Sequence, residues 1–300
     1  MPELREKLCS LSEAAALIPN GTRLALGGFA IHNHPMAFVY ELIRRGVKDL
    51  TIVGAVNAIE LDILIGAGCV KKVETSYVGL EAFGLAPNFR RAAEAGALEL
   101  REYSEDIAFE RFVMSSRGHP FVPTYQLFGT DIPKYNPDIK EAVNPLDGRP
   151  YHAIPAAEPD WVVLHAPMGD KYGNVLFFPD RQTPTNLDLI LSRTTRNLIV
   201  TVEQIVDRNR TFRLNTLNLV PRYRVKAIVE APYGAHPCSC IGLYNEDHHQ
   251  FEEYVKAGRD EAGFKEYLAK YVHGVKTQQE YLDLIGLQRL MKLNVVGGTL

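Results

Sequence analysis

Short apolar runs alternate with segments of helical spacing along the first hundred residues. Ser10 or Ser12 would begin a helix that stops at the Pro-Asn-Gly of residues 19–21. The apolar runs predict strands at 22–27, 50–53, 70–77 and 98–103, and the helical spacing predicts helices at 36–45, 58–66 and 88–95. This alternation predicts an α/β protein with a mostly parallel central sheet that helices cover on both faces.

Residues 117–160 interrupt the alternation, because prolines recur throughout them. Aromatic side chains lie among the prolines, so we expect an ordered excursion and not a linker. Strands resume at 160–166, 197–202 and 227–230, and a helical tail covers 250–290. No shift in composition marks a boundary, and we expect residues 1–300 to form a single domain.

Charge and composition exclude several classes of partner. Lysine and arginine number 33 and aspartate and glutamate 36, a formal net charge of −3 that favours neither nucleic acid nor a membrane surface. The first residues are too charged for a secretory signal, and no apolar run approaches the roughly 20 residues that span a bilayer. We therefore expect a cytoplasmic protein whose four cysteines are reduced thiols.

Cys238 and Cys240 are the one close pair of cysteines, and His236 precedes them. A zinc site usually has wider ligand spacing and more ligands than this pair offers. We therefore expect no metal site.

The most informative stretch is the end of the first predicted strand, where Gly27, Gly28 and Phe29 lead into a polar loop closed by Pro35. Ligands of open α/β sheets bind at the carboxyl ends of strands. Glycine has no Cβ, so a substrate could lie against the main chain and its N–H groups. The alternative is a tight turn with a purely structural role.

Four blocks of sequence carry a family resemblance. They are Asn20-Gly21-x-x-Leu24-Ala25-Leu26-Gly27-Gly28-Phe29 with Pro35, Asp170-Lys171-Tyr172-Gly173-Asn174, Ala231-Pro232-Tyr233-Gly234-Ala235-His236-Pro237, and Tyr281-Leu282-x-x-x-Gly286-x-x-Arg289-Leu290. In these blocks the chain resembles the α (A) subunit of family I coenzyme A transferases, most closely the glutaconate CoA-transferase type. Asn33 departs from the first signature, which usually has glycine there.

The resemblance implies a three-layer α/β fold of the CoA-transferase type and a partner, the β subunit. In that family the attacking glutamate belongs to the β subunit, in a Glu-Ser-Gly or Glu-Asn-Gly loop. Neither tripeptide occurs in this chain, so we expect it to act only with its partner. Coenzyme A would be part of the acyl-CoA substrate, and no permanently bound cofactor is implied.

His32 and His34 lie in the loop where glutaconate-type subunits tend to carry basic residues that meet a distal substrate carboxylate. Histidines are weaker, pH-dependent cations, and their neutral form would suit a more apolar acyl group. The alternative is two exposed loop histidines.

Glu105 follows the predicted strand 98–103, at a position where related α subunits of transferases usually have glutamine. A carboxylate there resembles the steroid-ring-opening hydrolases of the same fold, in which an α-subunit glutamate takes part. A partly buried Glu105 would act as a general base. The alternative is a residue that only caps a helix and interacts with its dipole.

His236, Asn57 and Ser76 lie at the ends of other strands and are weaker candidates for substrate binding; His236 has a structural alternative at the subunit interface. A transferase subunit is the first functional hypothesis. A ring-opening hydrolase, a decarboxylase of a glutaconyl-type CoA, and a non-catalytic subunit that shapes the acyl pocket are the alternatives. A Rossmann dehydrogenase is excluded, because the first turn lacks G-x-G-x-x-G and no acidic residue ends the second strand.

Overall fold

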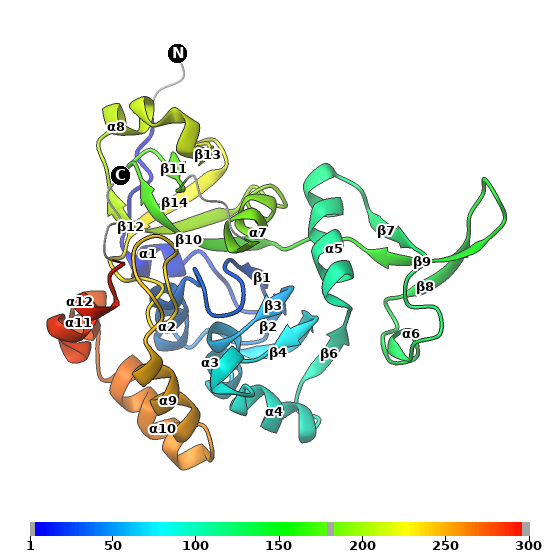
Figure 1. Ribbon diagram of the computed structural model, residues 1–300, viewed down its shortest axis with the longest axis horizontal. Helices are drawn as coiled ribbons and strands as arrows, with labels where there is room; N and C mark the ends of the chain where they lie inside the picture. The colour runs from blue at the N-terminus through cyan, green and yellow to red at the C-terminus, as the bar shows by residue number, and fades with distance from the viewer. Residues whose placement is uncertain (1–3, 179–182, 296–300) are drawn as a thin grey trace.

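The computed structural model describes residues 4–178 and 183–295, and a nine-stranded sheet forms its centre (Figure 1). Seven parallel strands lie in the order β14-β12-β10-β1-β2-β4-β6. Their bounds are β1 Arg23–Leu26, β2 Leu50–Val53, β4 Val70–Thr75, β6 Glu99–Glu102, β10 Trp161–Gly169, β12 Leu198–Ile205 and β14 Val225–Glu230. Two short antiparallel strands, β11 (Val175–Leu176) and β13 (Asn218–Val220), extend from the end of β10.

The strand order reverses beside β1. From β1 the chain adds β2, β4 and β6 on one side, and it then returns to place β10, β12 and β14 on the other. The carboxyl ends of β1 and β10 therefore form a topological switch point, where ligands of open α/β sheets bind.

Helices cover both faces of the sheet, which confirms the predicted three-layer arrangement (Figure 1). Leu24 and Leu26 of β1 belong to one apolar core and Ala25 belongs to the other, because successive side chains of a strand point to opposite faces. The first core is completed by α1 (Leu11–Ala15), α2 (Met36–Arg44), α3 (Ile59–Gly66), α9 (His248–Ala257), α10 (Glu261–Leu268) and α11 (Gln278–Ile285), and the second by α5 (Glu105–Arg117) and α7 (Thr183–Leu191).

The remaining elements are short. They are β3 (Val56–Asn57), β5 (Tyr77–Val78), α4 (Pro87–Glu94), α8 (Arg208–Arg213), α12 (Leu287–Leu293), the 3₁₀ turns Glu81–Phe83 and Asn215–Leu217, and a π-helical turn over Ala269–His273. No helix within residues 4–178 and 183–295 is long and apolar enough to cross a membrane.

Most predicted elements are confirmed within one or two residues. Ser10, and not Ser12, caps α1 in a capping box with Glu13. The predicted strand 70–77 divides in two, because β4 ends at Thr75 and β5 pairs with β3 in a separate small sheet. The elements α7, α8, β11 and β13 were not predicted from the sequence.

Residues 119–157, the arm, project away from the body (Figure 1). Three antiparallel strands form it in the order β7 (Phe121–Thr124), β9 (Pro150–Pro155) and β8 (Lys140–Val143), with α6 (Ile132–Tyr135) beside them. The expected ordered excursion is therefore confirmed.

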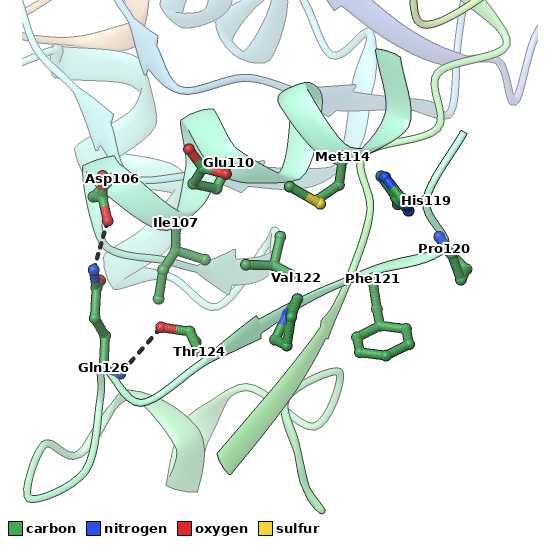
Figure 2. Close-up of a pocket in the computed structure, with 11 residues that line it drawn as sticks. Asp106, Ile107, Glu110, Met114, His119, Pro120, Phe121, Val122, Thr124 and Gln126 are labelled. Carbon is green, nitrogen blue, oxygen red and sulfur yellow. Dashed lines mark hydrogen bonds between the residues drawn. The ribbon is translucent and has the colours of Figure 1, made fainter. Parts of the chain in front are cut away.

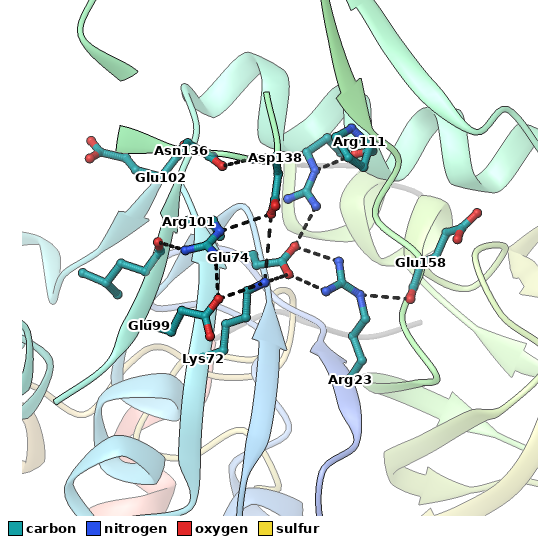
Figure 3. A network of polar contacts seen from close by, with 12 residues as sticks. Arg23, Lys72, Glu74, Glu99, Arg101, Glu102, Arg111, Asn136, Asp138 and Glu158 are labelled. Atoms are coloured by element: carbon teal, nitrogen blue, oxygen red, sulfur yellow. Dashed lines mark hydrogen bonds and ion pairs between the residues drawn. The ribbon is translucent and has the colours of Figure 1, made fainter. Parts of the chain in front are cut away.

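A buried ion-pair network joins the arm to the sheet (Figure 3). The Glu74 carboxylate of β4 accepts hydrogen bonds from Arg23 and, at 2.7 Å, from Arg111 of α5. Arg111 also donates to the Pro155 carbonyl, at 2.9 Å, and lies 4.0 Å from the centre of the Tyr103 ring. Burial alone would raise the pKa of Glu74, but hydrogen bonds from Arg23 and the charge of Arg111 lower it to about 2.

Candidate functional site at the carboxyl edge of the sheet

The turn after β1, residues 27–29, is packed too closely for larger side chains. A Cβ on Gly27 would lie 2.5 Å from Asp188 Oδ1 and 2.6 Å from a methyl carbon of Leu164. Gly28 has a φ of +92°, and a Cβ there would lie 2.5 Å from the His32 carbonyl oxygen. The two glycines are therefore required by contacts within the chain, whatever ligand the turn meets.

The backbone N–H groups of this turn are already hydrogen-bonded within the chain. Gly27 donates to the Val163 carbonyl at 2.7 Å and Gly28 to Asp188 Oδ1 at 2.8 Å. Phe29 donates to the His32 carbonyl at 3.0 Å. A ligand at this turn would therefore meet the half-buried Phe29 ring. It would not meet the free N–H donors that the sequence suggested.

His34 is fully buried, so its interpretation as an exposed loop residue is wrong. Its Nδ1 lies 2.7 Å from the Gly27 carbonyl oxygen and its Nε2 lies 2.6 Å from that of Ala30. The Glu60 carboxylate also lies 3.2 Å from Nε2. Both nitrogens of His34 are thereby used to hold the loop.

His32 is half-buried, and its Nδ1 lies 2.6 Å from Ser239 Oγ. This contact brings the segment after β14 next to the turn. Burial lowers the pKa of His32, which favours the neutral ring at neutral pH.

Asn57 and Ser76 are also engaged within the chain. The Asn57 side chain is buried, donates to Glu60 at 3.0 Å and accepts from Thr75 at 2.8 Å. The Ser76 hydroxyl donates to the Ala55 carbonyl at 2.6 Å, and Ser76 lines a small cavity of about 220 Å³ between β4 and β6.

His236 is buried against the C-terminal helices. The hydrogen bonds of its ring go to residues other than those of the turn. Its Nδ1 lies 2.7 Å from the Tyr281 hydroxyl and its Nε2 lies 2.9 Å from Asp247, which also accepts from Arg289 at 2.6 Å. Burial lowers the pKa of His236. Although burial alone would raise it, hydrogen bonds from His236 and Arg289 hold the pKa of Asp247 well below its usual range.

Glu105 is the first residue of α5 and is exposed, so the expectation of a partly buried carboxylate is wrong for this chain. The neighbouring Ser104 makes no side-chain cap to the helix. One turn after Glu105, the Phe109 ring packs against Phe29 with ring centres 5.8 Å apart. Residues four apart share a helix face, so the structure brings the face of α5 that carries Glu105 to the turn after β1.

A cavity of about 530 Å³ lies along another flank of α5, against β7 of the arm (Figure 2). Ile107, Met114 and Val122 form apolar walls, while Asp106 and Glu110 contribute carboxylates. Asp106 accepts a 2.6 Å hydrogen bond from Gln126. No local sequence pattern indicated this cavity, because its two sides are brought together only by the arm.

Glu203, in the last part of β12, was not predicted as a site residue. Its carboxylate accepts from His165 at 2.7 Å, from the Tyr244 hydroxyl at 2.6 Å and from the Gly234 backbone at 3.0 Å. His165, Glu203 and Cys240 place ligand-type atoms within 4.8 Å of one another. The carboxylate also holds the loop after β14 through the hydrogen bond from the Gly234 backbone. The sequence did contain one signal for this residue, because Glu203 is a charged residue within an apolar strand pattern.

Comparison with known proteins identifies the family. A model of the family described as coenzyme A transferase matches residues 9–231. The A subunit of glutaconate CoA-transferase from Acidaminococcus fermentans is 30% identical over 310 residues, which cover 97% of this chain and 96% of that protein. The crystal structure of that organism's glutaconate CoA-transferase has a TM-score of 0.93 over 97% of this chain and 96% of the compared chain.

Two other relatives differ in length from this chain or are named for another substrate. A protein of Archaeoglobus fulgidus is 39% identical over 97% of this chain, and the chain spans 65% of that protein's length. The A subunit of 3-oxoadipate CoA-transferase from Pseudomonas knackmussii is 34% identical, covering 92% of this chain and 96% of that protein.

Two further relatives have activities other than CoA transfer. The cholesterol ring-cleaving hydrolase IpdA subunit of Mycobacterium tuberculosis is 30% identical, covering 92% of this chain and 96% of that protein. A structure of the decarboxylase AibA/AibB is 31% identical with a TM-score of 0.76, over 88% of this chain and 100% of the compared chain. The family match and the close agreement in fold lead to one conclusion: the chain belongs to the coenzyme A transferase family.

Proposed function

We propose that the chain is the α subunit of a heteromeric CoA-transferase that moves CoA between an acyl-CoA and a carboxylic acid. The observation that carries this proposal is the turn at residues 27–29, which lies at the switch point of a sheet that matches glutaconate CoA-transferase in fold along nearly its whole length. The relatives named as A subunits support a partner, the β subunit.

The partner would supply the nucleophile, because this chain has no Glu-Asn-Gly or Glu-Ser-Gly sequence. Its glutamate would attack the acyl-CoA carbonyl to give a mixed anhydride and release CoA thiolate. The thiolate would then attack the glutamyl carbonyl and release the first acid, and the second acid would take the CoA through a second anhydride. Donors that stabilise the developing oxyanions would come from outside the turn, because its N–H groups are already used.

This chain would form the wall of the acyl pocket. Phe29 and Phe109 provide an apolar surface at the carboxyl edge, and His32 lies beside them in the loop. A largely neutral His32 is a poor partner for a distal carboxylate, which favours an apolar acyl group over a dicarboxylic one. Four free cysteines suit a reducing, cytoplasmic setting, and CoA would bind only as part of the substrate.

A ring-cleaving acyl-CoA hydrolase is the second candidate. Glu105 is the residue that favours it, because it lies on the face of α5 that meets the turn and its carboxylate forms no hydrogen bond within the described residues. In that case Glu105 would act as the general base toward water, and a closely similar relative is named as such a hydrolase. A structure of a decarboxylase is also similar to this chain, but no particular residue described above favours that activity.

The deciding experiment uses the chain co-purified with its β partner. A panel of acyl-CoAs would be incubated with and without acetate or succinate, while free CoA, new acyl-CoA and product mass are followed. New acyl-CoA that forms only with an acid present supports the transferase. Turnover without an acid, in which water adds to the acyl chain and CoA stays attached, would overturn it in favour of the hydrolase.

A further inference from the structure

Asp188 lies on α7, behind the turn at residues 27–29, and no step of the proposed mechanism uses it. Its side chain is completely buried. One carboxyl oxygen accepts the Gly28 N–H at 2.8 Å, and the other has no hydrogen-bond partner among residues 4–178 and 183–295.

The turn depends on this carboxyl for its shape. Gly27 makes the last hydrogen bond of the turn to the sheet, at the Val163 carbonyl. The backbone leaves the strand conformation at Gly28, whose φ is +92°, so the Gly28 N–H does not continue the pairing of the strand. Without Asp188 this N–H would be a buried donor with no partner, which proteins rarely tolerate.

The same carboxyl is also in direct packing contact with the turn. A Cβ on Gly27 would approach Asp188 Oδ1 to 2.5 Å, so the glycine backbone rests against the acid. Phe29 follows directly, and its ring meets Phe109 of α5. A movement of Gly28 would therefore move the Phe29 ring that forms the proposed acyl wall.

The surroundings of Asp188 favour the uncharged form of its carboxyl group. Burial raises the pKa of Asp188 well above its usual range, against a smaller opposite effect of the Gly28 hydrogen bond. A neutral carboxylic acid has the shape of an asparagine side chain, with one accepting oxygen and one donor. Asparagine is therefore expected to replace it without loss.

We propose that Asp188 is a positioning residue for the acyl group: by holding the Gly28 N–H it fixes the Phe29 ring against Phe109 at the carboxyl edge of the sheet. This inference rests on the proposed function, because it assigns the acyl wall to that ring. It adds a residue that lies 160 positions from the turn and outside every block of the family resemblance.

The test compares Asp188→Asn with two variants that remove the acceptor, Asp188→Ala, which leaves a cavity, and Asp188→Leu, which keeps the branched shape. Asp62→Ala serves as the matched control, because Asp62 is equally buried but bonds Asn88, Phe89 and Tyr254, away from the turn. Each variant is purified with the β partner. Two quantities are measured: kcat and KM for an acyl-CoA, and hydrogen exchange of the peptide that covers residues 24–34.

Asp188→Ala and Asp188→Leu are expected to lower kcat/KM about 10-fold and to speed exchange at Gly28 about 10-fold, the scale of one lost hydrogen bond. Asp188→Asn is expected to stay within about 2-fold in both measurements, because it keeps the acceptor. Asp62→Ala is expected to leave exchange at the turn unchanged.

Two results would overturn the inference. One is an Asp188→Asn variant as impaired as Asp188→Ala, and the other is unchanged exchange at Gly28 in both variants that lack the acceptor. If either Asp188→Ala or Asp188→Leu does not assemble with the β partner, the other of these two variants and Asp188→Asn still decide the question. If the unmutated complex transfers no CoA, the proposed function fails, while the exchange measurement still reports whether Asp188 holds the turn.

Discussion

Glu74 and Asp188 are two buried carboxyl groups that the fold treats in opposite ways. Glu74 lies among Arg23, Arg111 and Lys72, and its pKa is lowered to about 2. Asp188 accepts one backbone N–H, and burial raises its pKa well above the usual range. Burial is common to both, so the neighbouring cations of Glu74 account for the opposite directions of the two pKa shifts.

The difference corresponds to two structural tasks. The charged Glu74 needs several strong donors, and these donors join the sheet, α5 and the end of the arm (Figure 3). Asp188, whose uncharged form is favoured, accepts one backbone N–H behind a tight turn, and it forms no ion pair within the described residues. Ion pairs thus hold the arm, whereas a single hydrogen bond shapes the proposed site.

Removal of a cation beside Glu74 should destabilise the protein strongly. Arg111→Met would leave a buried carboxylate without its most buried partner and the Pro155 carbonyl without a donor. We expect a loss of about 3–5 kcal/mol in the free energy of unfolding, measured by urea denaturation.

Arg101→Met is the matched control for that variant. Arg101 belongs to the same network, but its partners Glu99 and Asp138 are 43% and 32% exposed. Its loss is expected to cost less than about 1 kcal/mol. Equal losses for the two variants would contradict the importance of burial at Glu74.

The two carboxyl groups should also affect the pH dependence of stability in opposite directions. Glu74 has a lowered pKa in the folded state, so its contribution is complete above its unfolded value of 4.5 and disappears as the pH falls toward about 2. The shift corresponds to at most about 3 kcal/mol. Glu74→Gln should therefore be less stable than the unmutated protein at pH 7 and should lose less stability between pH 5 and pH 3.

Urea midpoints at a series of pH values would measure this effect. Asp188 has the opposite sign, because its raised folded pKa makes stability fall as the pH rises above its unfolded value. Asp188→Asn should remove that decline and serves as the contrasting variant. Parallel pH profiles for all three proteins would show that neither carboxyl has the assigned charge.

The sequence predicted the layers of the fold because local patterns determine them. The strand β1 and the helix α2 are apolar runs with strand and helix periods, and their positions were confirmed to within a residue or two. The helix α7 was missed, because Thr-Pro-Thr-Asn begins it and a buried aspartate interrupts its apolar face. A buried polar side chain goes against the usual pattern of polar residues outside.

The candidate site was less predictable, because its contacts link distant parts of the chain. The glycines of the turn were visible in the sequence, but the acid that holds Gly28 lies 160 residues away. His34 and His236 were candidates for substrate binding, with an exposed loop residue and a structural residue as their respective alternatives. Both are buried and hydrogen-bonded within the chain.

Glu105 is an exposed carboxylate at the start of α5. Glu105→Gln should change the free energy of unfolding by less than about 0.5 kcal/mol, because the side chain is exposed and forms no hydrogen bond within the described residues. If the complex is a transferase, its kcat should stay within about 3-fold, since general acid–base catalysis by this residue is then not required. Glu102→Gln, an exposed carboxylate three residues earlier, is the control. A fall of about 100-fold in turnover for Glu105→Gln alone would identify a general base and favour ring cleavage over CoA transfer.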